Sequence, residues 1–199
     1  MPIYIALLRA VNVGGHNKIK MEDLRSLFES IGLKPAVTYI QSGNVVFKAK
    51  QKDPAKLAAA IEGAIEERFG FRSPTIVRSQ SELDAIISRN PFAGRQGLDP
   101  SKLLVTFLSS SPGDEGRKKV QAIKTEPEEL ILDGREMFIY YKEGIGKSKL
   151  PGAMIERALG VSGTGRNWNT VLKLSEMANG IGCENFLGCG SSMVIPYQS

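Results

Sequence analysis

The first third of the chain alternates apolar and polar positions in a way that predicts a strand, a helix and a hairpin. The run Ile3–Val11 is almost continuously apolar, which is typical of a strand buried on both faces. Apolar residues then recur at helical spacing over Met21–Ile31, and Gly32 follows as a candidate left-handed C-cap. The β-rich runs Ala36–Ile40 and Asn44–Phe47 flank a short polar turn and predict a hairpin.

A second helix and strand complete this first series. Asp53 and Pro54 supply an N-cap and a first-turn proline for a helix that runs to Gly70, and Thr75–Arg78 is a short strand. The order β-α-β-β-α-β is that of a ferredoxin-like domain, in which both helices cover one face of an antiparallel sheet.

The same order of elements then starts again after a linker. Ser79 and Glu82 form a capping box for a short linking helix, and the polar segment 91–101 is the expected linker. The second series consists of strand Lys102–Ser109, a helix from Ser111-Pro112, a hairpin of Glu129–Leu132 and Glu136–Tyr141 around Asp133-Gly134, helix Pro151–Leu159, strand Val161–Arg166 and a final helix Asn169–Met177 that ends near Gly180.

These elements predict the α+β class, with two ferredoxin-like βαββαβ subdomains in tandem and an extra C-terminal helix. The first subdomain with its linking helix spans residues 1–90, and the linker spans 91–101. The second subdomain with the C-terminal helix spans 102–180, and residues 181–199 are an irregular tail. The duplication is inferred from element order alone, because no residue-level repeat is visible.

Composition excludes several classes of protein. With 42% hydrophobic and 24% charged residues in 199, the chain has an ordinary globular composition, which rules out disordered, collagen-like and coiled-coil proteins. No apolar run is long enough to cross a bilayer, so no membrane partner is expected. The first residues have no basic start and meet Arg9 too early for the pattern of a signal peptide, and only Cys183 and Cys189 are present, so we expect a cytoplasmic protein.

The residue inventory also excludes most catalytic and metal chemistry. The single histidine, His16, supports neither a His-based triad nor a multi-histidine metal site. The two cysteines have the wrong spacing for a zinc or redox pair. We therefore predict no metal site, and neither a cofactor nor a catalytic residue is assigned.

The net charge of +5 is less informative than its placement, because basic residues gather in the glycine-rich segments Arg9–Lys20 and Lys142–Lys149. Backbone N–H groups that a glycine-rich turn leaves accessible beside a helix N-terminus attract oxyanions. The second segment, Gly144–Ser148, lacks the first glycine of a Walker A motif, since Tyr141 stands there. The candidate ligand-binding residues are Asn12, Gly14, Gly15, Gln41, Asn44, Gly146, Lys147, Ser148, Lys149, Arg166, Asn167, Trp168 and Asn169.

Structural roles compete with ligand binding at several of these positions. Gly-rich turns between strands and helices are common without any ligand, and the turn around Gly43 is also explained as a tight hairpin. Asn167 or Asn169 is a possible N-cap of the following helix, and Trp168 is a possible anchor of that helix against the sheet. Arg166 beside a helix N-terminus would favour a carboxylate or phosphate, from a ligand or from the protein itself.

Several of these segments together resemble an uncharacterised bacterial family, domain of unknown function 1697. They are IALLRAVNVGGHNKIKMEDLRSLFESIG, TYIQSGNVVF, NPF, GIGKSKL and GTGRNWNTVLKL, and the resemblance runs from about Ile3 to about Met177. The resemblance implies two α+β subdomains of ferredoxin-like character and no assigned reaction. The family's signature positions are here Arg9, Asn12, Gly14, Gly15, Gln41, Ser42, Gly43, Asn44, Gly146, Ser148, Lys149, Thr164, Arg166, Asn167, Trp168, Asn169 and Lys173.

The leading hypothesis is a binding module that takes a phosphorylated or carboxylated small ligand in a cleft between the two subdomains. A second hypothesis is RNA or nucleic-acid binding on an open ferredoxin-like sheet, although the hairpin strand Gly43–Phe47 lacks the aromatic motif of RNA-recognition modules. An enzyme that relies on positioning and on Arg or Lys charge is the third.

Overall fold

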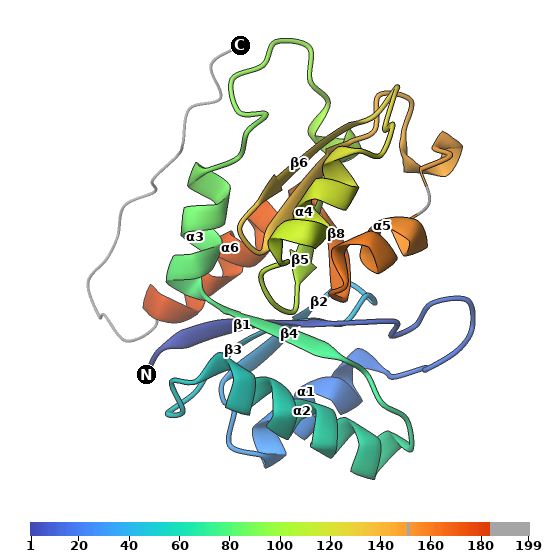
Figure 1. Ribbon diagram of the computed structural model, residues 1–199. Helices are drawn as coiled ribbons and strands as arrows, with labels where there is room; N and C mark the ends of the chain where they lie inside the picture. The colour runs from blue at the N-terminus through green and yellow to red at the C-terminus, as the bar shows by residue number, and fades with distance from the viewer. Residues whose placement is uncertain (151, 184–199) are drawn as a thin grey trace.

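The first half of the chain forms a four-stranded antiparallel sheet with two helices on one face (Figure 1). The computed structural model describes residues 1–150 and 152–183. The strands lie in the order β2-β3-β1-β4, and the predicted caps of α2 are confirmed: Asp53 accepts from the backbone N–H of Ala55, and Gly70 is left-handed. The elements are β1 (Ile3–Leu8), α1 (Met21–Ser30), β2 (Ala36–Tyr39), β3 (Asn44–Lys48), α2 (Pro54–Phe69) and β4 (Thr75–Ser79).

The second half forms another antiparallel sheet, with the order β6-β7-β5-β8. Its helices α4 and α5 contact each other on one face of this sheet, where Val120 and Ile155 pack with Ile139. Gly134, at a φ of 60°, forms the predicted hairpin turn between β6 and β7. The elements are β5 (Leu103–Leu108), α4 (Asp114–Gln121), β6 (Glu129–Asp133), β7 (Glu136–Tyr140), α5 (Gly152–Leu159) and β8 (Gly163–Asn167), with 3-10 turns at Pro100–Lys102 and Ile145–Lys147.

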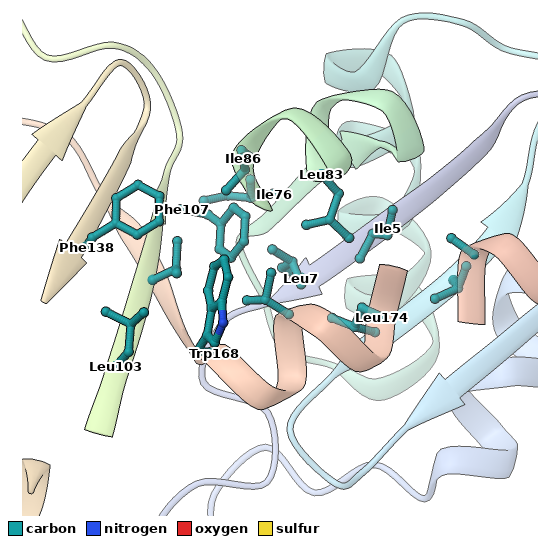
Figure 2. Packing of buried hydrophobic residues seen from close by; sticks show 14 of the residues in the cluster. Ile5, Leu7, Ile76, Leu83, Ile86, Leu103, Phe107, Phe138, Trp168 and Leu174 are labelled. Atoms are coloured by element: carbon teal, nitrogen blue, oxygen red, sulfur yellow. The ribbon is translucent and has the colours of Figure 1, made fainter. Parts of the chain in front are cut away.

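Two further helices join the sheets. Helix α3 (Gln80–Ser88) follows β4, helix α6 (Trp168–Cys183) follows β8, and the two helices contact each other (Figure 1). Figure 2 shows the apolar core that they share with both sheets, with Leu83 of α3 and Leu174 of α6 near Leu7 of β1. We call β1 to α3 the first unit and β5 to α6 the second unit.

This shared core explains why the first apolar run is continuous although its sheet is antiparallel. Tyr4, Ala6 and Leu8 face the core with α1 and α2, whereas Ile5 and Leu7 face the core with α3 and α6. A strand of a two-layer protein would show alternation instead, because one of its faces would meet water. Both faces of β1 are therefore covered by protein.

The linker and the C-terminal helix both contribute to the core. Phe92, at the start of the predicted linker, is only 2% exposed and lies 6.0 Å from the ring of Tyr140. Helix α6 continues to Cys183, so Ile181 belongs to the helix and is buried, although the predicted tail begins there. The rest of that tail, residues 184–199, lies outside the described residues.

Candidate functional site

The loop between β1 and α1 carries a small hairpin whose glycines have a structural explanation. His16 donates its backbone N–H to the Val13 carbonyl at 3.1 Å, and Gly14 and Gly15 have φ angles of 59° and 79°. Positive φ at both central residues is the signature of a type I′ turn, which favours Gly-Gly. Asn12 donates its own N–H to the Asn17 carbonyl at 3.1 Å and extends this hairpin.

The side chain of Asn12 ties this loop to the β2–β3 turn. Its amide nitrogen donates to the carbonyls of Ile19 and Gln41 at 3.0 and 2.9 Å, and its oxygen accepts from the Ile19 N–H at 2.9 Å. We call residues 9–18 and 40–44 the loop pair. Asparagine suits this position because it combines two donors with an acceptor on a short side chain.

The loop pair contains strained backbone. Ile40 has a φ of 49° and is 51% exposed, a conformation that is rare for a β-branched residue. Ala10 and Asn17 also lie in the left-handed region, at φ angles of 57° and 52°. Such conformations persist only where surrounding contacts enforce them, and they are concentrated at functional sites.

Arg166 of β8 supports the loop pair from the second unit. Its side chain is only 7% exposed, and burial lowers the pKa of the guanidinium to about 10, so it remains charged at neutral pH. All five of its N–H donors are directed at oxygen atoms of the protein, none of them a carboxylate. The acceptors are the Asn44 side-chain oxygen, Thr164 Oγ1 at 2.7 Å, and the carbonyls of Gly165 at 2.8 Å, Leu8 at 2.7 Å and Ser42 at 3.2 Å.

Arg166 therefore positions the loop pair rather than offering donors to a ligand. The expectation that an oxyanion relieves its charge is not met, because neutral oxygen atoms of the described residues occupy all five donors. Asn44, which is fully buried, is likewise a partner of Arg166, and its amide also donates to the Tyr39 carbonyl.

A large hollow lies beside the loop pair at the start of α1. It has a volume of about 930 Å³, and we call it the loop hollow. Three of the candidate residues, Asn12, Gly15 and Gln41, line it. The remaining lining residues are Lys18, Ile19, Lys20, Met21, Glu22, Asp23 and Phe69.

The charge of the loop hollow is mixed. Lys18 and Lys20 are lining residues, and the ion-paired lysines of the described residues lie elsewhere, at Lys119, Lys142 and Lys173. Of the two carboxylates, Asp23 lies 3.8 Å from Arg68, whereas Glu22 makes no ion pair within the described part of the chain. The hollow thus presents two ammonium groups that no carboxylate of residues 1–150 or 152–183 neutralises.

The N-terminus of α1 opens into the same hollow. Its N-cap, Lys20, provides no side-chain acceptor, so the first N–H groups of the helix have no side-chain cap. Such N–H groups, together with the helix dipole, favour negative charge.

The candidate residues of the second basic segment lie elsewhere. Lys147 and Lys149 line a separate hollow of about 410 Å³ on the second unit, and Gly146 lies in the adjacent 3-10 turn. Ser148 accepts a hydrogen bond from the Leu150 N–H at 3.0 Å through its hydroxyl. The structure therefore does not bring the two glycine-rich segments into one cleft.

The residues around Trp168 organise the start of α6. Asn167 accepts from the Asn169 backbone N–H at 3.0 Å, as an N-cap does, and donates to the Ser101 carbonyl at 2.6 Å. Trp168 is 8% exposed and lies 6.4 Å from Phe138 in the shared core. Asn167 therefore makes the contacts of an N-cap, and Trp168 makes those of an anchor that holds α6 against the sheet.

The sheet faces are covered, which bears on the nucleic-acid hypothesis. Every residue of β1 and β3 is buried, because α1 and α2 cover one face and α3 and α6 the other. Tyr141 is 7% exposed, and Tyr140 packs against Phe92. An RNA-recognition module stacks bases on aromatic residues of an open sheet, and the described residues of this sheet leave no such face.

Sequence reasoning missed several residues of the loop hollow. Lys18 and Lys20 belong to a basic segment that the sequence singles out, but nothing in their spacing separates them from solvated lysines. Phe69 is the last residue of α2, far from the loop pair in sequence.

No helix in the described range is long and apolar enough to span a bilayer, and no group of three acidic, histidine or cysteine side chains there is arranged to hold a metal ion.

Comparisons with known proteins identify a family and a fold. A family model described as "Protein of unknown function (DUF1697)" matches residues 1–138. No curated protein matches the chain. A solved structure, described as that of conserved bacterial protein SP0830 from Streptococcus pneumoniae, is similar with a TM-score of 0.71 and 23% identity. The match covers 90% of this chain and 99% of that chain, and it shows the shared fold.

Proposed function

This chain belongs to the family of proteins of unknown function DUF1697, and we propose that it binds a small phosphorylated or carboxylated ligand in the loop hollow. The observation that carries the proposal is the convergence of Asn12, Gly15 and Gln41 with Lys18 and Lys20 around one space of about 930 Å³. Ligand pockets of roughly 300–1,000 Å³ are typical for small molecules.

The electrostatics of the hollow favour an anionic group near the start of α1. Two ammonium groups without an ion-pair partner among the described residues and an uncapped helix N-terminus act on the same space. A phosphate or carboxylate placed there would receive charge-assisted hydrogen bonds, which are stronger than neutral ones.

The remaining lining residues favour phosphorylated ligands that also carry hydroxyl groups. The Glu22 carboxylate and the Gln41 amide are acceptors for hydroxyl donors, and the Phe69 ring offers an apolar surface. Sugar phosphates and nucleotides combine a phosphate, hydroxyl groups and an apolar face, so they fit this set better than a simple carboxylate.

The rigid loop pair supports binding without a large rearrangement. Asn12 and Arg166 fix the two loops before any ligand arrives, so little conformational entropy is lost on binding. The strained backbone at Ile40 is explained if the loop pair must keep this shape for a ligand.

We also propose that the two units are tandem ferredoxin-like repeats, with 1–90 and 102–180 on either side of linker 91–101. The shared strand order supports a duplication, and so do hydrogen bonds at equivalent positions. Arg166 of the second unit donates to the Leu8 carbonyl, and Arg78 of the first unit donates to the Leu108 carbonyl. In the same way, the Thr75 N–H donates to the Glu62 carboxylate, and the Gly163 N–H donates to the Glu156 carboxylate.

The ligand proposal is tested by thermal unfolding with a panel of sugar phosphates and nucleotides. A ligand at about 100 times its Kd adds about 2.7 kcal/mol of apparent stability, which raises the melting temperature measurably. We expect a shift with at least one member of the panel, and its loss in the double variant Lys18→Met/Lys20→Met.

Lys52→Met is the matched control, because Lys52 is exposed and lies outside the loop hollow. If no member of the panel shifts the melting temperature, or if the double variant responds like Lys52→Met, the proposal is wrong.

A further inference from the structure

Two buried arginines reach from one unit into the other in the same way. Arg78 of β4 donates to the Leu108 carbonyl at 2.9 Å, and Arg166 of β8 donates to the Leu8 carbonyl at 2.7 Å. Each of these carbonyls belongs to the last residue of the first strand of the opposite unit. The two arginines can therefore be compared position by position.

The side-chain acceptor of each arginine also lies at the same register position. Asn44 begins β3 and Glu136 begins β7, and each is opposite the penultimate residue of the neighbouring strand, β1 or β5. Arg78 Nε donates to the Glu136 carboxylate at 3.1 Å, whereas Arg166 Nε donates to the neutral side-chain oxygen of Asn44. The second unit thus has a carboxylate where the first unit has an amide.

This difference leaves the charge of Arg166 without a carboxylate partner among residues 1–150 and 152–183. Burial lowers the pKa of both guanidinium groups, but at Arg78 the charge of Glu136 partly offsets the effect of burial. Neutral oxygen atoms satisfy the N–H donors of Arg166 and do not cancel its charge. A buried charge without an opposite charge is costly, so its retention calls for a role.

The charge of Arg166 lies close behind the loop hollow. Arg166 donates to the Ser42 carbonyl at 3.2 Å, and the neighbouring residue Gln41 lines the hollow. Asn12, another lining residue, donates to the Gln41 carbonyl at 2.9 Å. Because salt screens a buried charge less than an exposed one, Arg166 raises the potential of the hollow without touching a ligand.

The charges at the hollow favour a doubly charged anion. Lys18, Lys20 and Arg166 are cations that no carboxylate of the described segments pairs with, whereas Glu22 is the one lining carboxylate there that makes no ion pair. A phosphomonoester carries a charge of about −1.5 to −2 at pH 7, so it offsets this excess. A phosphodiester or a carboxylate brings a single negative charge.

We propose that the loop hollow selects a phosphomonoester dianion, and that Arg166 is a positioning residue whose charge, left without a carboxylate partner by Asn44, determines this selectivity. This inference rests on the proposed function and narrows it from phosphorylated or carboxylated ligands to one class. At the equivalent position of the second unit, Glu136 neutralises the arginine, so no corresponding selectivity is expected there.

Isothermal titration calorimetry of the full chain with two probes tests the selectivity. Inorganic phosphate is largely a dianion at pH about 8, whereas dimethyl phosphate has a similar shape and one negative charge. At constant ionic strength, we expect inorganic phosphate to bind at least about tenfold more tightly than dimethyl phosphate, because the additional charge interacts with all three cations.

Variants at Thr164 test the role of the Arg166 charge. Thr164 Oγ1 accepts from Arg166 Nη1 at 2.7 Å, and Thr164 does not line the loop hollow. Thr164→Asp places a carboxylate at this acceptor, and Thr164→Asn is the matched control of the same shape without the charge. We expect Thr164→Asp to bind inorganic phosphate at least about fivefold more weakly than Thr164→Asn, whereas a merely structural role would affect both variants alike.

Asn44→Asp repeats the test from the other side of the guanidinium. It supplies the carboxylate that Glu136 supplies to Arg78, and we again expect phosphate binding at least about fivefold weaker. Asn179→Asp, at an exposed position of α6 outside the hollow, is the control for the change in net charge. Circular dichroism establishes beforehand that each variant is folded.

Either of two outcomes would overturn the proposal: equal binding of the two probes by the wild type, or equal binding of phosphate by Thr164→Asp and Thr164→Asn. If Thr164→Asp does not fold, Asn44→Asp decides, and phosphate binding like that of Asn179→Asp would overturn the proposal. The proposed function is judged separately. It stands if a member of the panel shifts the melting temperature and Lys18→Met/Lys20→Met removes the shift, whatever the Thr164 variants show.

Discussion

At the scale of single residues, Arg166 of β8 is a buried charged side chain that holds the loop pair in its conformation. Arg166 has no carboxylate partner among the described residues, and its planar guanidinium satisfies backbone carbonyls of Leu8 and Ser42 at once. Only the fork of an arginine reaches so many acceptors in fixed directions, whereas the ammonium group of lysine has three donors at one point.

We expect Arg166→Lys to lower the free energy of unfolding by about 2–3 kcal/mol, because several buried carbonyls lose their donor. Chemical denaturation followed by circular dichroism measures the change. Arg25→Lys, at an exposed position of α1, should stay within about 0.5 kcal/mol of the wild type. A similarly small effect of Arg166→Lys would contradict the positioning role.

Gly43 gives a second prediction at this scale, because it is restricted in two ways. It has a φ of 69°, and a Cβ atom there would lie 2.8 Å from Leu8 Cβ. Gly94 has a φ of 73° but no atom within 4 Å of such a Cβ, so Gly94→Ala measures the cost of the positive φ without any steric clash. We expect Gly94→Ala to cost about 1–2 kcal/mol and Gly43→Ala clearly more, as measured by denaturation. Equal costs would show that Leu8 yields without strain.

At the scale of elements, α3 begins with a complete capping box. Glu82 accepts from the Ser79 backbone N–H at 2.8 Å, and Ser79 accepts from the Glu82 N–H at 3.2 Å. Burial alone would raise the pKa of Glu82, but the hydrogen bonds from Ser79 and the charge of Arg135 outweigh it and lower the pKa below its usual value of 4.5. The folded state therefore favours the ionised carboxylate.

The pH dependence of stability follows from this lowered pKa. Because the folded state binds the proton less readily than the unfolded state, Glu82 stabilises the fold above pH about 4.5, and this contribution is lost as the pH falls through the folded pKa. We expect Glu82→Gln to be about 1 kcal/mol less stable at pH 7 and to differ less from the wild type at pH 3. Urea denaturation at both pH values checks this, with Glu67→Gln, at an exposed position of α2, as the control. If the difference between Glu82→Gln and the wild type were the same at both pH values, the charge of Glu82 would not be what stabilises the fold.

At the scale of the whole molecule, the strands, hairpins and helix caps were predictable because each depends on nearby residues. Asp53, Gly70 and Gly134 act within a few positions of themselves. The packing of α3 and α6 between the sheets was not predictable, since a linking helix and a terminal helix show only that each has an apolar side. The role of Arg166 was hidden for the same reason, because Asn44 is 122 positions away.

The shared core predicts that the two units unfold together. Leu83 of α3 is fully buried in the cluster that also contains Trp168, which is the only tryptophan of the chain. Leu83→Ala should therefore destabilise the second unit as well as its own, by about 2–5 kcal/mol. Trp168 fluorescence and far-UV circular dichroism should give one common denaturation midpoint in the wild type, and both should shift equally in the variant. If the midpoint measured by Trp168 fluorescence did not change in Leu83→Ala, the two units would be energetically separate. In that case Arg166 would have to fix the loop pair across an interface that the core does not hold closed.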